Sequence, residues 1–456
     1  MRGAIELKKI SDKKKIQWAR LIASSVGCQI VIAVCALLIS ILIARKLGGH
    51  LFGVWVFWGV LVSAPSVFYS GAIVAAARFM PTKHTQEEKR IVFWGLVQFQ
   101  LILILVSWVG LILINEVFFQ WRPWAEKLNI NGVDFTWVVL LALLRHVFQL
   151  VNSAGSQCAL GLQRIYLTQS MSAVKYVVDL LLVSIAAWQT VNVQDFLLIS
   201  MMCLVVSEAI MSCVWGAWLQ KALGGFVQPP GALRSIWGME IRKYSGPTIF
   251  TGIMTAAKER LPIVILGELG QWTEGALYKI ISQVCKFANS SYSVIGAELV
   301  PLLVGTKEGE KAQNALSYFA TVYHGVLGIL LLISGGIWLS LWNIGESSSG
   351  NLLLFVVISI FICKGSLRSA HTWGDYAGSR IWMTKWSAAF GGAYLLSILF
   401  LNQTSVEIAI CELIALIAAI TVAIFMPANA WRNKRASLFT TLAFILLFAG
   451  IYGLSL

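Results

Sequence analysis

Apolar residues fill most of this chain in runs that are each long enough to cross a lipid bilayer. A transmembrane helix needs about 20 mostly apolar residues. Twelve runs meet that length, and a thirteenth near the C-terminus is a further candidate. The pattern predicts membrane-spanning helices at residues 21–43, 51–76, 91–114, 136–160, 168–188, 196–219, 246–267, 275–303, 315–341, 352–374, 381–401, 406–427 and 437–455.

The predicted loops carry their basic residues on alternate sides of the membrane. The first twenty residues hold seven lysines and arginines, which predicts a cytoplasmic N-terminus because basic loops stay inside. Every second loop after that is again basic, whereas the loops between them carry mostly Asp and Glu. The alternation continues through the first twelve runs, which supports their number. A thirteenth span would leave the C-terminus outside.

Composition agrees with a polytopic membrane protein. The chain has 456 residues, of which 58% are hydrophobic and only 12% charged, and soluble domains carry about twice that charged fraction. The net charge is +14, but we expect no nucleic-acid partner because the basic residues follow the alternation that orientation requires. The eight cysteines have no metal-ligand spacing. No catalytic motif is present, so we expect neither an enzyme nor a cofactor or metal.

The eighth run carries a polar stripe. Its members are separated by steps of four, three, four and three, which places them on one face of a helix. A lysine at membrane depth is costly and normally faces a water-filled cavity or a partner. We interpret the stripe as lining a cavity that binds an anion; the alternative is a stripe packed on a neighbouring helix, with its lysines paired to buried carboxylates. The stripe consists of Lys279, Gln283, Lys286, Ser290 and Ser293.

Two further runs, the fourth and the tenth, carry polar stripes with helical spacing. They occupy equivalent places if the first twelve runs form two groups of six, and this match is limited evidence of the internal repeat found in secondary transporters. Lys364 and Arg368 are candidates for secondary contacts to the anion; the alternative is that they are anchors at the cytoplasmic interface. The two stripes are Arg145, Gln149, Asn152 and Ser156, and Lys364, Arg368, His371 and Asp375.

Basic residues outnumber acidic residues inside the predicted spans, and this excess favours a bound anion. Lys258 and Arg260 flank Glu259 and point to nearly opposite faces, so one of the two can face the cavity. Lys175 and Asp179 lie four residues apart, which favours an intrahelical ion pair. The carboxylates that are candidates for binding a coupling ion are Glu259, Glu298 and Glu412.

The longest cytoplasmic connection runs from Gln220 to Tyr244 and divides the first twelve runs into two sets of six. Its Gly-Gly and Pro-Pro-Gly sequences are incompatible with a helix interior. We predict an all-α polytopic membrane protein with two pseudo-symmetric six-helix lobes around a central cationic cavity, plus an extra C-terminal helix. The predicted units are a basic cytoplasmic N-terminus (1–20), an N-lobe (21–219), a linker (220–244), a C-lobe (245–427) and a basic loop with the thirteenth span (428–456).

Short motifs lie at the start of both halves. In the first half they are Ala-Arg-Lys-Leu-Gly at 44–48, Phe-Gly-Val-Trp at 52–55, Gly71 and Ala-Arg-Phe at 77–79; in the second half they are Gly-Pro at 246–247, Gly-Ala-Leu-Tyr at 275–278 and Glu-Leu-Val-Pro at 298–301. In these motifs the chain resembles polysaccharide flippases of the Wzx type, in the multidrug/oligosaccharidyl-lipid/polysaccharide (MOP) exporter superfamily. It departs from that family at Lys258-Glu259-Arg260, where relatives often have one acidic residue, and in a thirteenth span.

The resemblance implies a flippase that works by alternating access. It would move an undecaprenyl-pyrophosphate-linked oligosaccharide repeat unit to the outer leaflet of the cell inner membrane, for assembly of a surface polysaccharide such as O-antigen. Partners would be that lipid-linked glycan, the bilayer, a polysaccharide polymerase and a chain-length regulator. Arginine and lysine suit a pyrophosphate. Its expected ligands are Lys279, Lys286, Arg145 and either Lys258 or Arg260, and the expected sugar contacts are Gln149, Asn152, Gln283 and Ser290.

Two alternatives remain at this point. A multidrug exporter of the same superfamily would need buried carboxylates for cationic drugs, whereas basic residues predominate here. A glycan polymerase or ligase would need a large outer loop bearing arginines, and the longest outer loop has about twenty residues.

Overall fold

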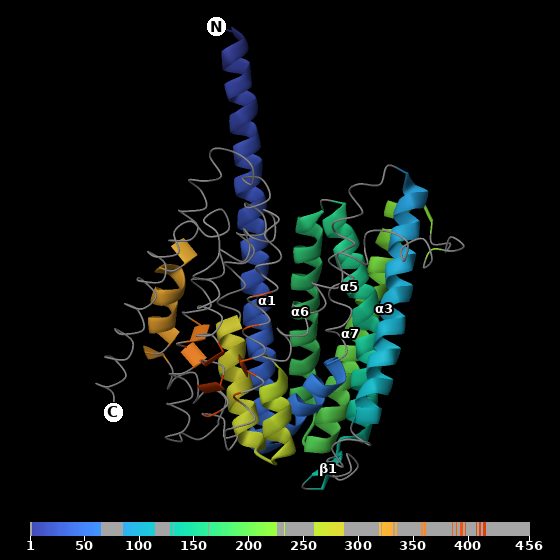
Figure 1. The fold of residues 1–456 in the computed structure, drawn as a ribbon, viewed down its shortest axis with the longest axis vertical. Coiled ribbons are helices and arrows are strands. Elements are labelled where there is room, and N and C mark those ends of the chain that lie inside the picture. Colours follow the sequence, from blue (N-terminus) through green and yellow to red (C-terminus); the bar gives the residue numbers. More distant parts are fainter. Residues whose placement is uncertain are drawn as a thin grey trace.

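The computed structural model describes residues 2–64, 85–114, 128–130, 132–162, 164–225, 232 and 260–286, and short pieces between residues 319 and 415. This part of the chain is a bundle of long helices with one small hairpin at one end (Figure 1). The helices are α1 (Arg2–Ser63), α3 (Gln86–Ile114), α5 (Thr136–Gly161), α6 (Ile165–Gln189) and α7 (Val193–Leu223). The hairpin pairs β1 (Asn129–Ile130) with β2 (Val133–Asp134), antiparallel.

The long helices coincide with the predicted spans. Runs 91–114, 136–160, 168–188 and 196–219 match α3, α5, α6 and α7. Within the described residues, four helical stretches are long and apolar enough to cross a membrane: Ser24–Ser63, Thr136–Ala159, Tyr166–Gln189 and Val193–Leu223. The chain is an all-α polytopic membrane protein, as predicted. The later spans lie largely outside the described residues, and the thirteenth lies there entirely.

A loop was expected at residues 44–50, between the first two predicted spans, but the chain does not form one there. Helix α1 continues through that region and is broken only at Gly48, whose φ of 74° and ψ of 165° are not helical. Residues that carry a side chain rarely adopt that positive φ, so glycine allows the chain to turn within a single residue. Figure 1 shows the turned second arm of α1, in lighter blue, at the end of the bundle where the hairpin also lies.

Local sequence signals mark where several helices begin and end. Thr85 and Glu88 form a reciprocal capping box at the start of α3, with both side chain-to-backbone bonds at 3.2 Å. The Asn192 side chain accepts a hydrogen bond from the backbone N–H of Gln194 at the start of α7. Gly224, with a φ of 70°, ends α7 in a left-handed cap. Helix α7 therefore stops at the first glycine of the predicted linker.

The hairpin is fastened to the start of α7. Asp134 and Gln194 exchange two hydrogen bonds: the Asp134 N–H donates to Gln194 Oε1 at 2.9 Å, and Gln194 Nε2 donates to the Asp134 carbonyl at 2.8 Å. The Asp134 carboxylate also accepts from the Thr136 N–H at 2.8 Å. Hydrogen bonds from the side chain and the backbone of Thr136 lower the pKa of Asp134, because they favour its charged form. The same carboxylate thereby caps the start of α5.

Lys46 ties the first arm of α1 to the C-terminal end of α6. Its half-buried ammonium donates to the carbonyl oxygens of Thr190, at 2.6 Å, and Ala187, at 3.2 Å. The last carbonyls of a helix lack intrahelical donors and carry a partial negative charge, so a lysine stabilises them.

Replacing Lys46 with methionine should lower the free energy of unfolding by about 1–2 kcal/mol, because two carbonyl oxygens lose a charged donor. The apparent melting temperature in detergent measures this change. Lys221→Met is the matched control, since Lys221 is exposed in the last turn of α7. Equal melting temperatures for the two variants would contradict the role given to Lys46.

Packing of the described helices brings the two halves of the chain together. Helix α6 lies between α1 and α7, and α5 packs on α7. One hydrophobic core includes Phe57 of α1, Leu197 of α7, and Leu266 and Ile281 of the segment 260–286. In that segment, called the second-half hairpin below, helical residues 260–268 and 272–286 are joined by a turn at Gly270. The outer faces of α5, α6 and α7 leave large apolar side chains exposed, which suits lipid.

Candidate functional site: a buried carboxylate between three helices

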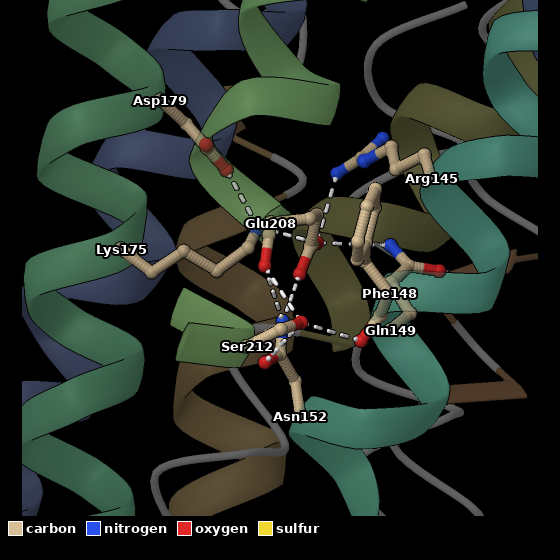
Figure 2. Close-up of polar contacts among 8 residues, drawn as sticks. All are labelled: Arg145, Phe148, Gln149, Asn152, Lys175, Asp179, Glu208 and Ser212. Carbon is tan, nitrogen blue, oxygen red and sulfur yellow. Dashed lines mark hydrogen bonds and ion pairs between the residues drawn. The ribbon is translucent and has the colours of Figure 1, made fainter. Parts of the chain in front are cut away.

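The most concentrated polar contacts in the described residues gather around Glu208, in the middle of α7. Its side chain is 3% exposed and lies in an otherwise apolar stretch of the helix. A charged carboxylate in this position is costly unless it is paired and hydrogen-bonded. Figure 2 shows side chains from α5 and α6 converging on it.

Helix α6 contributes an ammonium shared by two carboxylates. Lys175 Nζ lies 2.9 Å from Glu208 Oε1 and 2.7 Å from Asp179 Oδ2 (Figure 2). The Lys175 side chain is 13% exposed and that of Asp179 only 2%. The predicted intrahelical pair of Lys175 and Asp179 is confirmed, and it extends across the helix interface to α7.

Helix α5 contributes an amide pair and a guanidinium. Gln149 Nε2 donates to Glu208 Oε1 at 3.1 Å, and Asn152 Nδ2 donates to Glu208 Oε2 at 2.6 Å. Arg145 Nη2 lies 3.6 Å from Glu208 Oε1. Because positions 145, 149 and 152 share one face of a helix, all three reach the same carboxylate.

Ser212 fixes the side-chain amide of Asn152 on α5. Its hydroxyl lies 3.0 Å from Asn152 Oδ1, 3.1 Å from the Phe148 carbonyl and 2.9 Å from the Glu208 carbonyl. With its oxygen facing this hydroxyl, the Asn152 amide presents its N–H group to Glu208. The orientation of Asn152 is thereby fixed by the two helices it joins.

The charges in this cluster balance. Arg145 and Lys175 supply two cations, and Asp179 and Glu208 supply two anions. The attraction between the charges offsets their desolvation only because additional hydrogen bonds satisfy the Glu208 oxygens. Arg145 is the outer member, with 26% of its side chain exposed. It is therefore the charge in this cluster that an incoming ligand reaches most easily.

A cavity of about 260 Å³ lies between α6 and α7 beside the cluster. Its wall is almost wholly apolar and includes Met171, Val174 and Met211. The polar residues that line it are Ser170, Lys175 and Ser207. Lys175 is already committed to two carboxylates, so the cavity suits hydrocarbon better than a second charged group.

The structure assembles three of the predicted substrate-binding residues, but around a carboxylate. Arg145, Gln149 and Asn152 were expected to face a pyrophosphate and sugars, and they contact Glu208 instead. Their role toward a substrate stays a prediction. The excess of basic residues expected in the spans is locally cancelled here.

The stripe of the eighth span lies next to α1. Gln283 and Ser40 of α1 are joined by a 3.1 Å hydrogen bond from Gln283 Nε2 to the serine oxygen. Lys279 and Lys286 lie on the same helix face as Gln283; Lys279 is half-buried and Lys286 is exposed. Arg260 Nη1 donates to the Ser63 carbonyl at the end of α1. These four residues of the second half therefore lie at or near its junction with the first.

Several predicted site residues lie outside the described part of the chain. The substrate and anion contacts among them are Lys258, Ser290, Lys364 and Arg368, and the ion-coupling candidates are Glu259, Glu298 and Glu412.

The central residue of the cluster, Glu208, was not assigned a role by sequence reasoning. It was visible only as one of a few carboxylates at membrane depth. Its partners on α5 lie 56 to 63 residues away and its partner on α6 lies 33 residues away, at separations that no helical period can relate. An acid inside an apolar run of α7, facing polar stripes on two preceding spans, was the available signal.

No family model matches the chain, and no curated protein matches it. Solved structures do. The MATE multidrug transporter DinF-BH, solved with a bound ligand, has a TM-score of 0.65 at 14% identity, covering 91% of this chain and 96% of that one. The chain has the fold of the MATE transporters.

Two more solved structures extend the match. An outward-facing MATE family transporter of the MOP superfamily gives a TM-score of 0.58 at 13% identity, covering 92% of this chain and 96% of the other. A MOP superfamily transporter from Pyrococcus furiosus Vc1 (DSM3638), described as having a binding pocket of reverse polarity that suggests a different function, gives 0.58 at 14%, with the same coverage. The MATE fold thus accounts for most of the length of the chain.

Proposed function

We propose that this chain is a membrane transporter that moves an undecaprenyl-pyrophosphate-linked oligosaccharide from the inner to the outer leaflet of the cytoplasmic membrane, by alternating access. The observation that carries the proposal is the position of the Lys279–Gln283–Lys286 stripe. Its central residue contacts Ser40 of α1, so the stripe is directed to the junction of the two halves. A transporter of this fold admits its substrate between the halves, and a cationic stripe there favours an anion over a cation.

The charge of the substrate gives the transport step a direction. Each negative charge moved outward across an inside-negative membrane gains about 2.3 kcal/mol per 100 mV. The glycan and pyrophosphate would cross between the lobes while the lipid tail stays in the bilayer. Arg145 adds a partly exposed cation on the first half: 26% of its side chain is exposed, and its guanidinium lies 3.6 Å from Glu208.

The proposal predicts that Lys279→Ala with Lys286→Ala abolishes most export of the surface polysaccharide, because the pyrophosphate loses two cationic contacts. The measurement is the amount of surface polysaccharide in the producing cell, normalised to the amount of the protein in the membrane. Lys221→Ala is the matched control, since it removes a positive charge from the exposed end of α7. Unchanged polysaccharide in the double variant, at normal protein level, would overturn the proposal.

A multidrug exporter is the second candidate. DinF-BH, one of the matching structures, is described as a multidrug transporter, and the first half of this chain also holds the buried carboxylates Asp179 and Glu208. Both carboxylates, however, are paired with cations of their own half. Greater sensitivity of a deletion strain to cationic dyes, with normal surface polysaccharide, would favour this candidate.

A further inference from the structure

We propose that two glycines, one in each half of the chain, form a reciprocal latch that closes the transporter on its outer side. The latch consists of Gly53 and Phe57 on the second arm of α1, and Gly267 and Trp272 on the second-half hairpin. The proposal rests on the transporter function but on no particular substrate.

The first contact of the latch places backbone on backbone. A Cβ added to Gly53 would lie 1.9 Å from the Trp272 carbonyl oxygen and 2.5 Å from its carbonyl carbon. Real Cβ atoms do not approach other atoms that closely, so any side chain at position 53 would force the two segments apart. Because the obstacle is backbone rather than the end of a flexible side chain, it cannot rotate away.

In the second contact the halves are exchanged, and the obstacle is an aromatic ring instead of backbone. A Cβ on Gly267 would lie 2.3 Å from the Phe57 ring of α1. Phe57 is fully buried, and its ring meets that of Trp272 edge to face, with centroids 5.3 Å apart. Each half thus supplies one glycine and one aromatic residue, and each aromatic residue packs against the glycine of the other half.

The latch lies at the end of the bundle that faces outward in the predicted orientation. Gly48 marks the turn between the first two spans, and Gly270 marks the turn of the second-half hairpin. Both turns belong to loops that the distribution of basic residues assigns to the outside. A substrate entering from the cytoplasmic side and leaving outward must therefore pass where these four residues now meet.

The contact continues inward from the latch. Ser40 meets Gln283, and the Ser63 carbonyl accepts from Arg260. Ser40 is eight residues from Gly48, which is about 12 Å along a helix. When the latch opens, Ser40 should become accessible from the outside, whereas with the latch closed it should be protected.

Labelling of a single cysteine tests the latch without any glycan. In a background lacking the native cysteines, Ser40→Cys is exposed to a membrane-impermeant maleimide added outside intact cells. Adding Gly53→Val or Gly267→Val should raise the labelling rate at least about five-fold, because either side chain holds the two segments apart. Gly59→Val is the matched control: Gly59 lies on the same arm of α1, and a Cβ there would meet no atom within 4 Å.

Milder variants keep the test decisive if valine prevents folding. Gly267→Ala introduces a smaller side chain against the Phe57 ring, and Phe57→Ala removes that ring. Both variants should still be labelled faster than Gly59→Val. Labelling equal to the parent in well-expressed Gly267→Ala and Phe57→Ala proteins would overturn the latch. So would rapid outside labelling of the parent itself. The latch and the proposed substrate can fail separately. If the latch variants are labelled faster while the Lys279→Ala, Lys286→Ala protein still exports normal polysaccharide, the latch is upheld and the proposed substrate is rejected.

Discussion

A Glu208→Ala variant is expected to reach the membrane in much smaller amounts and to melt at a much lower temperature than the parent. Removing this carboxylate leaves Arg145 and Lys175 at membrane depth with Asp179 as the remaining anion of the cluster. Breaking a buried ion pair by deleting one partner costs about 3–5 kcal/mol. The amides of Gln149 and Asn152 also lose the carboxylate oxygens that accept their hydrogen bonds. Thermal unfolding in detergent measures the loss.

Glu208→Gln separates charge from shape in this experiment. It keeps an oxygen for the α5 amides and removes only the negative charge. We expect it to melt between the parent and Glu208→Ala. If Glu208→Ala were as stable as the parent, the carboxylate would not organise these three helices.

The second large effect is expected for Lys175→Met, which removes the cation between two carboxylates. Asp179 would lose its ion-pair partner among the described residues, while Glu208 would keep Arg145 and the α5 amides. The loss should again be about 3–5 kcal/mol. Adding Asp179→Asn should recover part of it, because the neutral amide no longer needs a counter-ion.

The four proteins of this double-mutant cycle give the coupling between Lys175 and Asp179 directly. We expect a coupling energy above about 1 kcal/mol from their melting data, since the two side chains are in contact and largely buried. Additive effects of the two substitutions would mean that the 2.7 Å contact contributes nothing to stability.

The sequence predicted the helices of the first half well because each is defined by local signals. Apolar runs of sufficient length placed α3, α5, α6 and α7, and the glycine pair after Leu223 marked the end of α7. The prediction of a loop before the second span was wrong. The single residue Gly48 joins the two helical arms instead, because one positive φ is enough to redirect a helix.

The candidate site was harder to predict because it depends on contacts between spans. The spacing of Arg145, Gln149 and Asn152 correctly placed them on one face, and the four-residue spacing of Lys175 and Asp179 correctly predicted their pair. Neither spacing indicates which helix lies opposite. That the opposing group is a carboxylate on α7, rather than a bound anion, follows only from how three helices pack.

Gly48 also has a mechanical meaning. The two arms of α1 meet at this one residue, and Lys46, two positions earlier, anchors the first arm to the end of α6. No slack chain separates the arms, so a displacement of the second arm is taken up as rotation about a single pivot. The second arm of α1 would then rotate about Gly48 while the first arm stays fixed to α6.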